Sequence, residues 1–263
     1  MKQIIVLILL ISLGSSTLVI AGEDEEMKKY EDRSARADQW VFSDLPRHIG
    51  NDFKESFFNG WSLLGLAGGS IIIAGVHTQD TSIQNTFQTK RPFGKKFDDI
   101  MNIGANPFLL TGGSLLTLGI AELLDSPAAK KTAVTAGIFF ESLMVTETVA
   151  LGLQLSTRRA RPDGSGNSSF PSGHTTGVFT AASVAATLYG PWVGVPSFAL
   201  ASLVGLSRID ANKHFASDVL AGALLGTIMG SGVARFHKKE FSSIFLVPTM
   251  KADSMGIEIV HPF

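Results

Sequence analysis

The sequence of 263 residues contains no cysteine. This excludes a disulfide scaffold, a thiolate zinc site, an iron–sulfur cluster and a cysteine nucleophile. Charged residues are also scarce, at 17% of the chain against about 25% in ordinary soluble domains. The 22 basic and 23 acidic side chains leave a formal net charge of −1. Proteins that bind nucleic acid mainly through electrostatic attraction have more basic than acidic side chains, so we expect no nucleic-acid partner.

Apolar residues are abundant instead, at 45% of the chain, which excludes a disordered protein. The length fits one large domain or at most two. Six apolar stretches are long enough for helices and lack the alternation of half-buried strands. We therefore predict an all-α helical bundle of about six core helices, and the stretches are residues 60–76, 105–121, 132–153, 171–190, 191–207 and 216–234.

The lengths of these stretches are close to the roughly 20 residues that span a bilayer. Glu141 and Glu147 would then have to face the bundle interior. Gly222, Gly226 and Gly230 recur every four residues and predict a face for close helix contact. Core helices of a soluble bundle share these features. The sequence favours membrane association but leaves a soluble bundle open.

The two ends of the chain differ from the bundle. Residues 1–21 have the basic start, apolar run and small residues of a signal peptide, and residues 3–22 could alternatively stay as an uncleaved anchor. Both alternatives carry the next segment across the inner membrane of a bacterium-like cell. We divide the rest into a polar N-terminal segment (22–59), a bundle domain (60–235) and a C-terminal tail (236–263), in which two apolar runs around a polar turn suggest a β-hairpin.

Charges in the second half of the chain gather at the ends of the apolar stretches. Arg158, Arg159 and Arg161 follow the third stretch, where three guanidinium groups suit an anion with several oxygens, although a basic flank can also orient a membrane helix. A helix that begins at Pro171 would aim the free N–H groups of its first turn at a phosphate. Those N–H groups belong to Ser172, Gly173 and His174.

A third cluster lies between the last two stretches. His214 and Asp218 are four residues apart, so on a helix they would share a face and could form a hydrogen bond. A carboxylate behind an imidazole fixes its tautomer and makes the other ring nitrogen a nucleophile or base. Alone, such a pair is commonly a surface contact. With Arg208 nearby and a second histidine, His174, the set suits phosphoryl transfer, in which one histidine attacks and the other protonates the leaving group.

The three clusters together resemble the motifs of the type 2 phosphatidic acid phosphatase superfamily. The matching segments are Arg161-Pro162, Pro171 to His174, and Ser207-Arg208 with His214 and Asp218, and the resemblance covers roughly residues 60–235. This superfamily includes lipid phosphate phosphatases, class A acid phosphatases and vanadium haloperoxidases. The resemblance implies a helical bundle that needs no cofactor or metal for phosphatase chemistry.

The resemblance also implies a role for each motif residue. His214 would attack phosphorus to form a phosphohistidine, Asp218 would orient it, and His174 would protonate the leaving oxygen. The phosphoryl oxygens would be bound by Arg161, Arg208 and the amides around Ser172 and Gly173.

The sequence departs from the superfamily pattern at Gln154, where a lysine is usual. An amide can donate hydrogen bonds but brings no charge. We therefore count Gln154 among the phosphate-binding candidates, with Arg159 or its neighbour Arg158 as a compensating cation. The gap between Pro162 and Pro171 is also shorter than usual, which suggests a tight lip over the site.

Our first hypothesis is a metal-independent phosphatase that hydrolyses phosphomonoesters or pyrophosphates of lipids, with a phosphorylated lipid and the membrane as its partners. A soluble periplasmic acid phosphatase is the alternative. Gln154, in place of the superfamily's lysine, counts against a vanadium haloperoxidase. The two histidines and Asp218 count against a structural membrane protein with a decayed site. We expect an exported protein whose active site is periplasmic, either at the inner membrane or free in the periplasm. If all six stretches crossed a bilayer, however, the site would face the cytoplasm. No oligomeric state is predicted.

Overall fold

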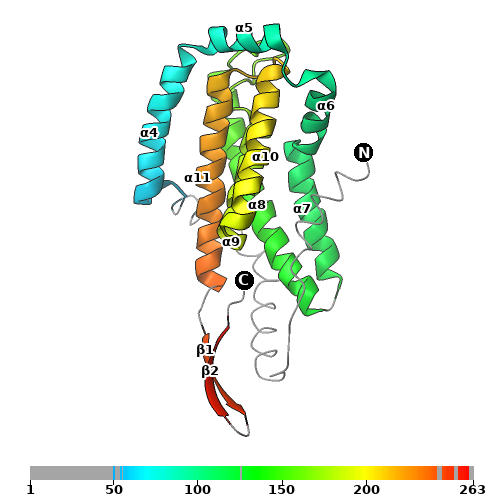
Figure 1. The fold of residues 1–263 in the computed structure, drawn as a ribbon, viewed down its shortest axis with the longest axis vertical. Coiled ribbons are helices and arrows are strands. Elements are labelled where there is room, and N and C mark those ends of the chain that lie inside the picture. The colour runs from blue at the N-terminus through cyan, green and yellow to red at the C-terminus, as the bar shows by residue number, and fades with distance from the viewer. Residues whose placement is uncertain are drawn as a thin grey trace.

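The computed structural model describes residues 50, 54, 56–124, 126–241, 245–251 and 254–260. The predicted signal peptide, and most of the polar segment 22–59, lie outside these residues. The described part is a helical bundle followed by a two-stranded antiparallel sheet (Figure 1), so the predicted all-α fold class is confirmed. Its helices are α4 (Gly60–His77), α5 (Asp80–Lys90), α6 (Gly94–Gly104), α7 (Pro107–Glu122), α8 (Pro127–Thr157), α9 (Gly173–Tyr189), α10 (Pro191–Asp210) and α11 (Ala216–Phe241).

Six of these helices coincide with the six predicted apolar stretches. The other two, α5 and α6, are additions that the sequence did not predict, because they are short and polar. α5 is held by tertiary contacts instead, since the amides of Gln84 and Gln88 donate hydrogen bonds to the carbonyl oxygen of Ile209 at 3.0 and 3.3 Å. Such contacts supply the stability that a helix of eleven residues lacks on its own.

The helix ends follow local capping rules. The Asn106 side chain accepts hydrogen bonds from two amides of the first turn of α7, and Ser126 accepts one at the start of α8. Pro107, Pro127 and Pro191 each occupy a first helical position, where a missing N–H costs nothing. These signals start α7, α8 and α10 at fixed residues.

The centre of the bundle is the contact between α9 and α11, and α9 also packs on α8 and α10. The glycine face predicted on α11 makes this contact. A Cβ atom at Gly222 would lie 2.7 Å from the Ser172 carbonyl oxygen, one at Gly226 would lie 2.8 Å from the Thr180 nitrogen, and one at Gly230 would lie 2.6 Å from the Thr180 carbonyl oxygen. The two backbones therefore approach as closely as only glycine permits.

Within the part of the chain that the structure describes, three helices are long and apolar enough to cross a membrane: Ala128–Thr157, Pro191–Asp210 and Ala216–Lys238. Two bent pairs, Ser62–His77 with Asp80–Lys90 and Gly94–Gly104 with Pro107–Glu122, raise the number to five if each pair is one span. Large apolar side chains are exposed on the outer helices, for example Phe108 at 87% and Trp192 at 92%. A surface of this kind fits a bilayer better than water.

The C-terminal strands β1 (Phe245–Lys251) and β2 (Ser254–Val260) pair antiparallel, with Phe245 opposite Val260 and Lys251 opposite Ser254. This confirms the predicted hairpin in the tail. In Figure 1 the hairpin extends beyond one end of the bundle, and α5 lies across the other end, between α4 and α6.

The glycine contact gives a test of the fold. We expect Gly226→Ala to lower the free energy of unfolding by about 1–3 kcal/mol, because the new methyl group overpacks the α9–α11 contact. Gly113→Ala in α7 is the matched control. Nothing lies within 4 Å of a Cβ there, so the better helix propensity of alanine should stabilise by up to about 1 kcal/mol. Thermal unfolding in detergent measures both, and equal shifts would contradict the proposed packing.

Candidate active site

The three motifs meet at the end of the bundle across which α5 lies (Figure 1). α8 and α10 end there, and α9 and α11 begin there. Backbone hydrogen bonds join the segments: the Ser172 amide donates to the Asp218 carbonyl at 3.1 Å, and the Ser169 amide donates to the Arg159 carbonyl at 3.0 Å. Residues far apart in the chain are thus fixed as one cluster.

His214 lies in the turn before α11 and is 3% exposed. Its Nδ1 atom is 2.7 Å from the Ser169 carbonyl oxygen. A carbonyl oxygen only accepts hydrogen bonds, so Nδ1 carries the ring proton and Nε2 keeps its lone pair. The geometry therefore leaves Nε2 as the nucleophilic or basic atom of this ring.

The sequence predicted a direct hydrogen bond between His214 and Asp218 on one helical face, and the structure corrects this. α11 begins only at Ala216, so His214 is not helical and the four-residue rule does not apply to it. The Asp218 carboxylate accepts hydrogen bonds from the Ser169 hydroxyl at 2.6 Å and the Phe215 amide at 2.9 Å. Within the described residues, Ser169 connects the two side chains, because its hydroxyl binds Asp218 and its carbonyl oxygen binds His214. No sequence motif had indicated Ser169.

The pKa of His214 is lowered to about 3. Burial is the main cause, and electrostatic repulsion by Arg161, by Arg208 and by His174 when it is protonated adds to it, while the hydrogen bond to Ser169 opposes it. These charges act on His214 because the four side chains converge. The ring is consequently neutral at physiological pH, which is the state a nucleophile needs.

Arg208 is buried at 2% exposure, and α6 supplies two of its hydrogen-bond acceptors. Its Nη1 donates to Asn102 Oδ1 at 2.6 Å, and its Nη2 lies 3.4 Å from the Asp98 carbonyl oxygen. Arg161 donates from Nη2 to the Ser168 hydroxyl at 3.1 Å. The Nε–H groups of both arginines are buried and have no acceptor among the described residues. Buried donors are rarely left so, and an anion would supply the missing acceptors.

Arg159, predicted to bind phosphate, has other partners in the structure. Its Nη2 donates to Asp80 Oδ2 at 2.7 Å, and its Nη1 donates to the Asp218 carboxylate and to the Ser217 hydroxyl. The guanidinium also lies over the Phe215 ring, 4.4 Å from its centre. Two carboxylates balance its charge, so the contacts of Arg159 are those of a link between α5 and the motif residues.

Asp80 is part of the site although sequence reasoning missed it. Besides the contact with Arg159, its carboxylate accepts hydrogen bonds from the Ser217 amide at 3.0 Å and the Ser217 hydroxyl at 2.6 Å. No spacing rule relates Asp80 to residues more than seventy positions away. Only its place at the start of α5 brings it here.

The first turn of α9 begins two residues later than the sequence predicted. Ser172 is the N-cap, the helix begins at Gly173, and the Ser172 amide is already bound to the Asp218 carbonyl. The amides of Gly173 and His174 remain as the donors that a helix start offers to an anion. His174 Nε2 is 3.2 Å from the carbonyl oxygen of Asn102, another residue that sequence reasoning missed.

Gln154, at the position where the superfamily carries lysine, lies beneath this turn. Its Nε2 atom donates to the Pro171 carbonyl at 2.9 Å. A Cβ on Gly173 would lie 3.5 Å from the same nitrogen, so the amide is packed against the start of α9. In the structure Gln154 thus supports the anion-binding turn through a backbone contact.

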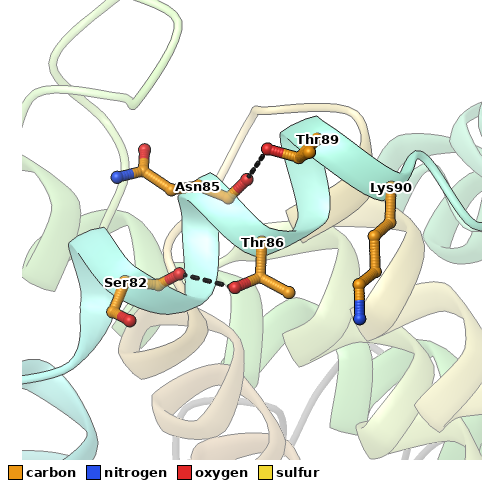
Figure 2. A pocket seen from close by; sticks show the side chains of 5 residues that line it. All are labelled: Ser82, Asn85, Thr86, Thr89 and Lys90. Atoms are coloured by element: carbon orange, nitrogen blue, oxygen red, sulfur yellow. Dashed lines mark hydrogen bonds between the residues drawn. The ribbon is translucent and has the colours of Figure 1, made fainter.

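A pocket lies on the exposed face of α5 (Figure 2). It is lined by Ser82, Asn85, Thr86, Thr89 and Lys90. Thr86 and Thr89 use their hydroxyl groups on carbonyl oxygens of their own helix. These two hydroxyl groups are therefore already used in hydrogen bonds to the backbone of α5. None of the residues predicted for the site lines this pocket.

Comparison with known proteins confirms the resemblance seen in the motifs. Residues 128–242 match the family model of the PAP2 superfamily. The segment contains all three motifs. It excludes α4 to α7, which the resemblance had included.

A lipid A 1-phosphatase from Porphyromonas gingivalis is 47% identical over 75 residues. The match covers 27% of this chain and only 17% of that protein's length. A transmembrane PAP2-type phosphatidylglycerolphosphate phosphatase from Bacillus subtilis shares the fold, with a TM-score of 0.53 and 21% identity over 68% of this chain and 96% of the other. LpxE from Aquifex aeolicus gives a TM-score of 0.45 and 22% identity, over 59% of this chain and 94% of the other.

The buried state of His214 predicts how stability depends on pH. The unfolded chain takes up a proton on His214 below about pH 6.5, whereas the folded protein does not until about pH 3. The free energy of unfolding should therefore fall as the pH is lowered from 7 to 4.5. His214→Asn removes this group, so its unfolding temperature should fall less than that of the wild type over the same range. Equal falls would show that His214 does not titrate as described.

Proposed function

We propose that this protein is a PAP2-type phosphatase that hydrolyses phosphate or pyrophosphate esters of membrane lipids. The observation that carries the proposal is the pair of buried arginine Nε–H groups, of Arg161 and Arg208, that find no acceptor in the described part of the chain. They accompany a neutral histidine whose Nε2 lone pair is kept free by Ser169. A bound phosphoryl group would satisfy both arginines and meet the nucleophile.

The chemistry follows from these positions. The Nε2 atom of His214 forms a bond to phosphorus while the bond from phosphorus to the lipid oxygen breaks. Burial is the main reason that the pKa of His174 is lowered to about 4 in the free protein, and the charge of Arg208 adds to it. A phosphate dianion beside His174 raises this pKa, and protonated His174 then gives its proton to the leaving oxygen. Water then attacks phosphorus and returns a proton to His174. The phosphorus–nitrogen bond breaks, and orthophosphate leaves with His214 neutral again.

Positive charge stabilises the transferred group throughout. Arg161 and Arg208 bear on the phosphoryl oxygens, and the first-turn amides of α9 add two further donors. Asp218 keeps its place behind the nucleophile by accepting from Ser169 and Arg159. We assign Arg159 to this positioning role, in place of direct phosphate binding.

Lipid substrates are supported by the surface of the bundle. The exposed apolar side chains of α4, α7 and α10 would face acyl chains, and the site lies at one end of the candidate spans, where a head group would sit. The relative from Porphyromonas gingivalis is a lipid A 1-phosphatase, and its matched segment is 47% identical. We therefore place the 1-phosphate of lipid A first among candidate substrates. A soluble acid phosphatase would have no use for these apolar faces.

The reaction can be tested with purified protein in detergent, without added metal. We expect release of phosphate from lipid A, with little activity on p-nitrophenyl phosphate. His214→Ala should abolish turnover, because no other group replaces the nucleophile. Arg161→Ala should lower kcat/KM by at least about a hundredfold, since charge-assisted hydrogen bonds to the transferring group are lost.

Arg158→Ala is the matched control for Arg161→Ala, because Arg158 is exposed and its side chain, among the described residues, donates to the Leu155 carbonyl of α8 at 3.3 Å instead of entering the site. Its kcat/KM should stay within about twofold of the wild type. Failure of the wild type to release phosphate from lipid A and other lipid phosphates would refute the proposed function. Strong activity on p-nitrophenyl phosphate alone would favour the acid phosphatase.

We further propose that the site faces the periplasm, on the strength of the predicted export signal. The sequence has no cysteine, so a single introduced thiol can report this cleanly. Ser165 lies in the exposed loop beside Arg161. A membrane-impermeant maleimide added to intact cells should label Ser165→Cys fully. Labelling only after the inner membrane is opened would place the site in the cytoplasm.

A further inference from the structure

The PAP2 segment begins at residue 128, yet a residue of α6 touches two of the proposed site residues. The Asn102 side-chain oxygen accepts from Arg208 Nη1 at 2.6 Å, and its backbone oxygen is 3.2 Å from His174 Nε2. Asn102 is exposed, whereas Arg208 is buried. Asn102 thus contacts the guanidinium and the imidazole from the solvent side of the site.

From this geometry we infer that Asn102 is a positioning residue of the phosphate site: its amide orients the Arg208 guanidinium and its carbonyl orients the His174 ring. The inference rests on the proposed function and deepens it. A backbone oxygen only accepts, so His174 Nε2 carries a proton and donates it to Asn102, which fixes the orientation of the ring. The neutral Asn102 amide holds Arg208 without adding a negative charge beside it, so this contact leaves the guanidinium charge available to a phosphate.

The position of α6 is itself fixed by charged side chains. Arg91, at the C-cap of α5, donates to the Asp210 carbonyl at 2.6 Å and to Asp98 Oδ2 at 3.3 Å. Asp98 is four residues before Asn102, on the same face of α6. The Asp98 carbonyl also receives Arg208 Nη2. Arg91 therefore ties α6 to the end of α10 and holds Asn102 over Arg208.

The chemical identity of residue 102 distinguishes positioning from a purely structural role. Asn102→Asp keeps an acceptor of the same shape, so a structural role predicts that it behaves better than Asn102→Ala. A positioning role that spares the charge of Arg208 predicts the opposite order. The new carboxylate would pair with Arg208 and compete with phosphate for it, whereas alanine only loosens the guanidinium.

The experiment measures binding of orthovanadate, a phosphate mimic, by calorimetry, together with kcat and KM on lipid A. We expect Asn102→Ala to weaken vanadate binding about tenfold, and Asn102→Asp to weaken it further, with KM raised in both. Unfolding temperatures should stay near that of the wild type, because the side chain is exposed. Asn85→Ala and Asn85→Asp on the exposed face of α5 (Figure 2) are the matched controls and should bind as the wild type.

The outcomes separate the two proposals. Unchanged vanadate affinity in both Asn102 variants, or tighter binding by the Asp than by the Ala variant, would overturn the role of Asn102. Wild-type protein that binds vanadate but hydrolyses no lipid phosphate would refute the proposed function alone, and the order of the variants would still decide the role of Asn102. Wild-type protein that neither binds nor hydrolyses would overturn both.

Discussion

The hydrogen bonds of Ser169 hold the candidate site together. Its carbonyl oxygen accepts from His214, and its hydroxyl donates to Asp218, so one residue sets the tautomer of the histidine and the position of the carboxylate. Ser169 can do this because its own amide is bound to the Arg159 carbonyl and its side chain is wholly buried. A loop that is otherwise free of regular structure thereby acquires the rigidity that a nucleophile requires.

Charge balance around this loop separates the arginines by role. Arg159 lies between the carboxylates of Asp80 and Asp218 and contributes to architecture. Arg161 and Arg208 each keep a buried Nε–H donor that no described residue accepts, so their positive charge is the part of the cluster that an anion could bind. The same charges, together with burial, keep His214 neutral. Buried arginine charges would destabilise an ordinary core. Here they lie where a bound phosphoryl group would balance them.

The N-terminal helices complete a site whose motifs lie in the C-terminal half. α5 supplies Asp80, which binds both Arg159 and Ser217. α6 supplies Asn102, which contacts Arg208 and His174. Both helices are polar and short, and both are held by side chains that bind the backbone at the end of α10. The contacts that stabilise these two helices are consequently also the contacts that set the geometry of the site.

The sequence by itself determined the helical class, because its apolar stretches have the length of helices and lack the alternation of half-buried strands. It also determined the residues of the three motifs and the close contact of α11, since glycines every four residues specify a face. It could not determine α5 and α6, whose stability comes from partners more than a hundred residues away, such as Gln84 on the carbonyl of Ile209.

The tertiary structure alone decided how the motif residues meet. Helical spacing suggested that Asp218 touches His214, but the chain turns before α11 and Ser169 takes that place. Arg159 and Arg161 are two positions apart and have the same side chain, yet Arg159 is bound by two carboxylates and Arg161 keeps an Nε–H donor that no described residue accepts. Such differences depend on which distant groups arrive at each side chain. The local sequence pattern indicates which functional groups a segment offers. Which groups bind them depends on how the helices pack in the folded bundle.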